Sequence, residues 1–283
     1  MTDQAQKLRE LMGKRQEIKV VTVTSGKGGV GKSSIAVNLA IALSRLGIRV
    51  LVVDADFGLA NVDVMLGVTS KYNVSHFLRG EKGLHEIVQL GYEGVRFISG
   101  GSGVYELMKM DESQLRRLME GLTRLDAPVD FIIIDTGAGI NDNILQMVLA
   151  SSETILVTTP EPTAILDAYA FVKTIDGKNR AHPIHIIMNK CDNRKEAQRV
   201  QDGFRAVVEK HLHKQINQLG AVMYDHDVPL SIKRQTPIIV SDPEGNTARS
   251  IVAIARALLD MPSAAAGPNK LAKLFYKMLG GRG

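Results

Sequence analysis

The residues best suited to chemistry form one glycine-rich loop, TSGKGGVGKSS (residues 24–34), which directly follows the apolar run IKVVTVT. Gly26, Gly31, Lys32 and Ser33 fit the pattern GxxxxGK(S/T) of a phosphate-binding loop. In such a loop backbone N–H groups close around phosphate oxygens, the lysine reaches the β- and γ-phosphates, and the hydroxyl binds Mg²⁺. We therefore predict a site for a nucleotide and Mg²⁺, in which the loop contributes Gly28, Gly29, Val30, Gly31, Lys32, Ser33 and Ser34.

Three aspartates follow apolar runs at points where buried strands would end. Asp54 and Asp56 follow LVV, and Asp135 follows FIII. Because parallel strands end at the edge of the sheet where ligands bind, we expect these aspartates beside the phosphate loop. Asp135 has the position of a carboxylate that acts on Mg²⁺, mostly through water. The letters DTGA around Asp135 also occur in aspartic proteases, but those use two such loops in an all-β fold, and this chain has one copy.

The elements that must position these residues alternate along the chain. Stretches with helical spacing separate short apolar runs that are typical of strands buried on both faces. This pattern predicts an α/β fold with a doubly wound, mostly parallel sheet, in a single domain from residue 18 to residue 260. The expected strands cover residues 20–24, 49–54, 95–100, 130–135, 154–159 and 184–189.

Composition restricts the class of protein further. The chain has 283 residues, of which 45% are hydrophobic, and its single cysteine, Cys191, excludes an internal disulfide framework or an iron–sulfur cluster held by several of its own cysteines. No apolar run is long enough to span a membrane, and the charged first residues do not resemble a signal peptide, so we expect a cytoplasmic protein. The net charge of +5 favours an acidic partner such as nucleic acid or anionic lipid.

Lys27 is not required by the ordinary phosphate loop. Its place in KGGVGKS resembles the deviant Walker A motif of the MinD/ParA family of dimeric ATPases. The resemblance implies that Lys27 crosses to the nucleotide of a second subunit in an ATP-dependent homodimer. It also implies that Asp56 orients or deprotonates the attacking water, and that Asp54 lies near Mg²⁺. The simpler alternatives are a solvated lysine and two aspartates that cap loop structure.

The base of the nucleotide is predicted from NKCD, residues 189–192, which fits the NKxD pattern by which Ras-like GTPases recognise guanine. In the MinD family an asparagine at this strand end pairs with adenine. The type of phosphate loop therefore favours ATP and ADP over GTP. We expect Asn189 to contact the base and the segment around Asp225 to close the opposite side.

The last residues form a separate unit after a linker, residues 261–268. In residues 269–283, apolar side chains recur at the spacing of one helical face, with lysines on the flank, a pattern typical of a helix in a membrane interface. It resembles the membrane-targeting helix of MinD and of the flagellar branch of the family. A helix packed on the protein core is the alternative. The predicted membrane-binding residues are Leu271, Leu274, Phe275, Met278 and Leu279.

The first residues, 1–17, form an N-terminal arm that contains DQAQKLR. This stretch is similar to the DQAxxLR motif of the flagellar branch, called FlhG, FleN or YlxH, in which the arm engages and activates FlhF, a GTPase of the signal-recognition-particle type. A solvated tail is the alternative. The predicted partner-binding residues are Asp3, Gln4, Ala5, Leu8 and Arg9.

Together these resemblances predict an ATPase that controls the number or placement of flagella. It would cycle between a cytosolic monomer and a dimer attached peripherally to the inner face of the cell membrane. Basal-body proteins of the C-ring or a flagellar transcription regulator are further expected partners. Two alternatives remain open, a MinD-type ATPase that positions cell division and a ParA-like ATPase that partitions DNA, although the terminal helix disfavours DNA as the partner.

Overall fold

The computed structural model describes residues 18–56, 61–101, 112–123 and 129–261. Their framework is an eight-stranded sheet with the order β3-β4-β2-β5-β1-β6-β7-β8, in which every neighbouring pair is parallel except β3 and β4. The predicted fold class is thereby confirmed. The strands are β1 (Lys19–Ser25), β2 (Val50–Ala55), β3 (Gln89–Leu90), β4 (Arg96–Ile98), β5 (Phe131–Ala138), β6 (Glu153–Thr158), β7 (Ile184–Cys191) and β8 (Asn217–Met223).

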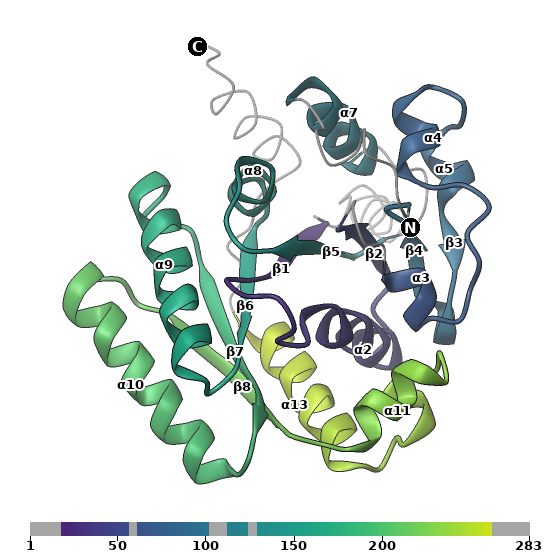
Figure 1. Cartoon of the computed structure of the whole chain (residues 1–283). Coiled ribbons are helices and arrows are strands. Elements are labelled where there is room, and N and C mark those ends of the chain that lie inside the picture. Colours follow the sequence, from purple (N-terminus) through teal and green to yellow (C-terminus); the bar gives the residue numbers. More distant parts are fainter. Residues whose placement is uncertain (1–17, 57–60, 102–111, 124–128, 262–283) are drawn as a thin grey trace, which may run out of the picture.

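Helices cover both faces of this sheet (Figure 1). One face carries α2 (Lys32–Arg45) and α13 (Asn246–Asp260), whereas α7 (Glu112–Thr123), α8 (Asp142–Ala150), α9 (Pro162–Lys178) and α10 (Arg194–Leu212) cover the other. The shorter helices are α3 (Val62–Met65), α4 (Val74–Leu78), α5 (Leu84–Ile87), η1 (Tyr92–Gly94), α11 (Asp227–Lys233) and α12 (Ile238–Ser241). None of the described helices has the length and apolar character needed to cross a membrane.

The alternation of side chains along β1 explains this layering. Val21 and Val23 are fully buried against α2 and its neighbours, whereas Val20 belongs to the core on the opposite face. Because successive side chains of a strand point to opposite faces, a strand that is apolar at every position must be covered on both sides. The central position of β1, between β5 and β6, places the loop after it in the middle of the carboxyl edge of the sheet.

The opposite edge of the sheet holds a buried polar cluster. Glu153, 1% exposed, accepts from Lys19 Nζ and pairs with His185 Nε2, each at 3.0 Å. Lys19 Nζ also donates to the carbonyl of Leu258 at 3.4 Å, so the start of β1 and the end of α13 lie together. Residues 1–17 and 262–283 join the described part of the chain at this edge. The predicted arm and terminal helix themselves lie outside the described residues.

Candidate nucleotide-binding site

The predicted phosphate loop connects the end of β1 to the start of α2. Gly31, the residue before α2, has φ +90°, and a Cβ on it would lie 2.4 Å from Asn189 Nδ2. Gly31 has no side chain to cap α2, so the first N–H groups of this helix remain available to an anion. A Cβ on Gly26 would lie 2.5 Å from the carbonyl carbon of Asp167, which shows how closely the loop packs on α9.

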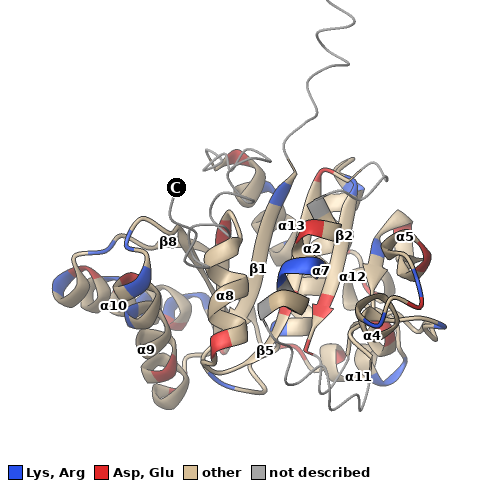
Figure 2. Cartoon of the chain, turned by 90° about the horizontal axis from the view of Figure 1, so that it is seen from above, with Lys and Arg blue, Asp and Glu red and all other residues tan. Residues whose placement is uncertain are grey.

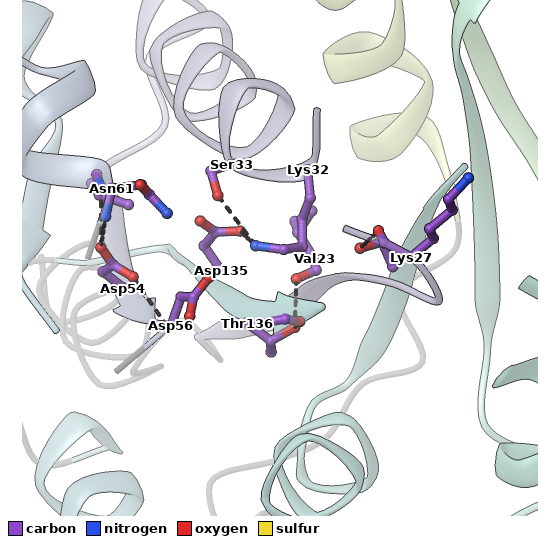
Figure 3. A network of polar contacts seen from close by, with 12 residues as sticks. Val23, Lys27, Lys32, Ser33, Asp54, Asp56, Asn61, Asp135 and Thr136 are labelled. Atoms are coloured by element: carbon purple, nitrogen blue, oxygen red, sulfur yellow. Dashed lines mark hydrogen bonds and ion pairs between the residues drawn. The ribbon is translucent and has the colours of Figure 1, made fainter. Parts of the chain in front are cut away.

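Lys32 and Asp135 form a buried ion pair behind this loop. Lys32 Nζ lies 2.8 Å from Asp135 Oδ1 and 3.2 Å from Ser33 Oγ, and the side chains of Lys32 and Asp135 are 7% and 0% exposed (Figure 3). The other carboxylate oxygen of Asp135, Oδ2, is buried and has no hydrogen-bond partner. Mg²⁺ is usually held by one or two carboxylates together with substrate phosphates and water. The unpartnered oxygen of Asp135 and the Ser33 hydroxyl fit such an ion.

The two aspartates that end β2 differ in their surroundings. Asp54 is fully buried, and it accepts backbone N–H groups from Asp56 at 3.1 Å, Asn61 at 2.8 Å and Val62 at 3.0 Å. Burial, together with the nearby charge of Asp135, raises the pKa of Asp54 to about 7 despite those three hydrogen bonds. Asp56 is half-buried and lines the cavity described below. Asp54 therefore organises the backbone after β2, and its place beside Mg²⁺ stays a prediction.

A cavity of about 660 Å³ opens in front of the phosphate loop, a volume typical of ligand pockets. Asn189, at the end of β7, lines it and donates through Nδ2 to the carbonyl of Val30 at 2.8 Å. Asp225 lies across the cavity, where its carboxylate accepts the hydroxyl of Thr247 at 2.7 Å and the N–H of Asp227 at 2.9 Å. Asp192, the last residue of NKCD, is exposed and is not among the residues that line this cavity.

Lys27 extends away from this cavity (Figure 3). Its amino group contacts Glu161 Oε2 at 3.0 Å and Thr163 Oγ1 at 2.8 Å, at the start of α9. The pair is solvent-accessible, with the two ionic side chains 38% and 63% exposed. Such an exposed contact is weak enough to break when a second molecule approaches.

The structure thus brings most predicted residues together. Asp54 and Asp135 lie buried behind the loop, Val30 is buried within it, and Lys27 alone among the predicted residues of this region points elsewhere. The predicted residues that line the cavity are Gly28, Gly29, Gly31, Lys32, Ser33, Ser34, Asp56, Asn189 and Asp225.

Other lining residues are not predicted from the sequence. Lys190 has φ +56° and donates to the carbonyl of Gly29 at 2.7 Å, a conformation that no local pattern indicates. Thr247 and Ile251 reach the cavity from α13, far along the chain. The only available signal for them is the amphipathic pattern of α13, which indicates a packed helix but not what it packs against.

This fold and this loop define a P-loop NTPase. The family model named ParA, described as NUBPL iron-transfer P-loop NTPase, matches residues 17–259. Among curated proteins, the antiactivator FleN of Pseudomonas aeruginosa is 32% identical over 251 residues, covering 89% of this chain and 90% of that protein. The flagellum site-determining protein YlxH of Helicobacter pylori is 35% identical over 241 residues, covering 78% of each.

Solved structures agree with the fold. The cell division ATPase MinD of Pyrococcus furiosus superposes with a TM-score of 0.74 at 24% identity and covers 86% of this chain and 99% of its own. MinD of Pyrococcus horikoshii, solved with Mg-ADP, gives a TM-score of 0.73 at 25% identity, covering 86% and 96%. The chain belongs to the ParA/MinD family of P-loop NTPases, and it is an ATPase of that family.

Proposed function

We propose that this chain is an ATP-driven switch of the flagellar branch, which controls the number or placement of flagella. In this proposal it dimerises with ATP, and the dimer binds anionic membrane through residues 269–283. The N-terminal arm then engages and activates FlhF. Hydrolysis returns the protein to a cytosolic monomer. The similarity to FleN and YlxH over most of the chain supports the flagellar role.

One observation, the position of Lys27, supports the proposed dimer. Ser25, Lys32, Ser33 and Ser34 of the phosphate loop line the cavity, but Lys27 lies outside the cavity of its own chain and contacts Glu161. A lysine that leaves its own site is free to supply positive charge to the phosphates of a second copy, where it would stabilise charge during phosphoryl transfer. The cost of releasing it from Glu161 is small because the pair is solvent-exposed.

The residues of the chain have separate tasks in hydrolysis. Lys32 and the N–H groups at the start of α2 hold phosphate oxygens, and Asn189 and the Asp225 segment hold the base. Asp56 lines the same cavity and orients water toward the phosphate. Ser33 and Asp135 would hold Mg²⁺, Asp135 mostly through water, and the ion would supply positive charge that offsets the charge of the phosphates.

A mixed-dimer assay tests the exchange of lysines. Lys27→Ala and Asp56→Ala should each lower ATP turnover by about 10²-fold or more, since each removes one group from every site. When the two variants are mixed in equal amounts, half of the dimers contain one subunit of each. One of the two sites in such a dimer is complete only if Lys27 acts across the interface. Activity should then return to about a quarter of the wild-type value. A mixture as inactive as its components would show that Lys27 acts within its own subunit.

The arm is tested separately. GTP turnover by purified FlhF should rise when a peptide of residues 1–19 is added, and a peptide with Gln4→Ala should stimulate less, because a glutamine can orient water in a partner's site. An arm from a known activator provides the positive control. If only that control stimulates FlhF, the flagellar assignment fails, and the ATPase site is unaffected.

A further inference from the structure

The groove between α10 and α13 is a second concave surface, which adjoins the nucleotide cavity at Met223, a residue that lines both. It has a volume of about 800 Å³ and is lined by residues of α10, β8 and α13. Figure 1 shows where these three elements lie. Among the described residues, β8 is the last strand of the sheet and pairs with β7 alone. An edge strand of this kind presents outward-facing N–H and C=O groups that can pair with another chain.

Small residues keep this edge accessible. Gly220 lies in β8, where a Cβ would come within 2.6 Å of Ile254 Cγ1 on α13. Ala221, Ala253 and Ala257 line the same groove and bring little side-chain volume into it. Gln201 of α10 donates to the carbonyl of Gly220 at 2.8 Å, so a polar side chain already serves one backbone group there. The groove therefore combines small lining side chains with the edge of a strand, the two features that an added peptide strand uses.

The charged residues that line the groove are all basic. Arg194 and Arg249 line it and are exposed, and neither forms an ion pair with another described residue. No described lining residue is acidic. Asp202, which is not a lining residue, accepts hydrogen bonds from the lining residues Gln198 and Gln218 and pairs with Arg205 at 3.2 Å. Elsewhere α10 carries basic and acidic residues side by side (Figure 2), so the groove differs from the rest of this helix.

We propose that this groove binds an extended acidic segment of another protein, which adds a strand to the free edge of β8. Charge complementarity selects this occupant. The chain's own residues 262–283 contain four lysines and arginines and no acidic residue, and residues 1–17 contain four basic and three acidic residues, so neither terminal segment is the acidic segment that two arginines would attract. A second copy would bring the same two arginines to the groove. The site lies outside the nucleotide cavity and needs no nucleotide chemistry.

A pair of labelled heptapeptides tests the charge. The peptides EVTVEVT and KVTVKVT have equal β-propensity and opposite charge, and anisotropy with the full-length protein measures their affinities. The acidic peptide should bind at least tenfold more tightly. The double variant Arg194→Glu, Arg249→Glu should reverse that order. Lys173→Glu, Lys210→Glu makes the same change in net charge at exposed positions outside the groove and should leave the order intact.

Two further variants test the mode of binding. Ala253→Trp fills the groove and should abolish binding, whereas Ala206→Trp on the outer face of α10 should not. Methylating alternate amide nitrogens of the acidic peptide should abolish binding in one register and spare it in the other, because only one set pairs with the strand edge. Equal affinity of the two unmodified peptides, an equal effect of both double variants, or insensitivity to N-methylation in either register would overturn the proposal.

Discussion

Asp54 shows how one buried carboxylate can hold a loop in place. It accepts three backbone N–H groups from residues that follow β2, while no solvent reaches it. A carboxylate that accepts several N–H groups is ordinarily more acidic, but here burial and the charge of Asp135 outweigh those bonds. The ionised form is therefore the costly one in the folded protein.

This cost predicts a particular pH dependence. The pKa of Asp54 rises from 3.8 to about 7 on folding, so the folded state retains a proton that the unfolded state loses. The stabilisation of the folded state by this bound proton is fully present below pH 3.8 and is lost as the pH rises through about 7. The free energy of unfolding, measured in urea, should therefore fall between pH 4.5 and 7.5 relative to that of Asp54→Asn.

Asp202→Asn is the matched control, because hydrogen bonds from Gln198 and Gln218 lower the pKa of Asp202. The contribution of Asp202 to the free energy of unfolding therefore changes with pH only below this range. The difference between wild type and Asp202→Asn should stay constant from pH 4.5 to 7.5. Parallel curves for wild type and Asp54→Asn over that range would contradict the assignment for Asp54.

The Lys32–Asp135 pair predicts a stability effect that is independent of nucleotide. Lys32→Met leaves Asp135 buried without a counter-ion, which should cost about 3–5 kcal/mol in the nucleotide-free protein. Adding Asp135→Leu removes the stranded charge and should recover most of this loss. Urea denaturation measures both variants. Arg205→Met breaks an exposed pair with Asp202 and should cost less than about 1 kcal/mol.

At the level of elements, the contact between the phosphate loop and α9 positions the site. Gly26→Ala forces a methyl group against the backbone of Asp167, so loop and helix must separate. We expect a loss of about 1–3 kcal/mol in unfolding free energy and at least tenfold weaker ATP binding, measured by denaturation and calorimetry. Gly177→Ala, within α9 and with no atom near the new methyl, should be neutral or slightly stabilising. Equal behaviour of the two variants would contradict this reason.

The central elements could be predicted from the sequence, and the edges could not. β1, β2, β5, β6 and β7 are buried at nearly every position and each contains a short apolar run, so their sequence alone indicates strands buried on both faces. β8 escapes prediction because it is partly exposed, contains Gly220 and has no continuous apolar run, and β3 has only two residues. Edge strands are formed by pairing with a neighbour, which a local pattern does not encode.

The residues of the site also fall into a group that the sequence predicts and a group that it does not. Glycine spacing encodes the phosphate loop, because its backbone conformation and its chemistry arise from consecutive residues. The contact of Lys27 with Glu161 and the approach of α13 to Asp225 depend on how distant elements pack. No spacing rule connects residues separated by such distances along the chain.

At the level of the whole molecule, the proposed membrane role of the terminal segment predicts a difference in liposome binding. A chain ending at Met261 lacks the apolar face and the lysines of residues 269–283, each of which would contribute about 1 kcal/mol near anionic lipid. With ATP, it should float with anionic liposomes much less than the full chain, while ATP binding is unchanged. Zwitterionic liposomes provide the control for charge. Equal flotation of both proteins would refute the membrane role.

The Lys19–Leu258 contact has a geometric consequence for the two terminal segments. Both segments join the described part of the chain side by side, at the edge of the sheet opposite the nucleotide cavity. The seven residues 262–268 span at most about 25 Å when fully extended. Any surface that holds residues 269–283 therefore keeps the end of α13 within about that distance, and residues 1–17 join the chain beside the end of α13. A partner on the same surface would meet the arm at a high effective concentration, so even a weak contact between them would suffice.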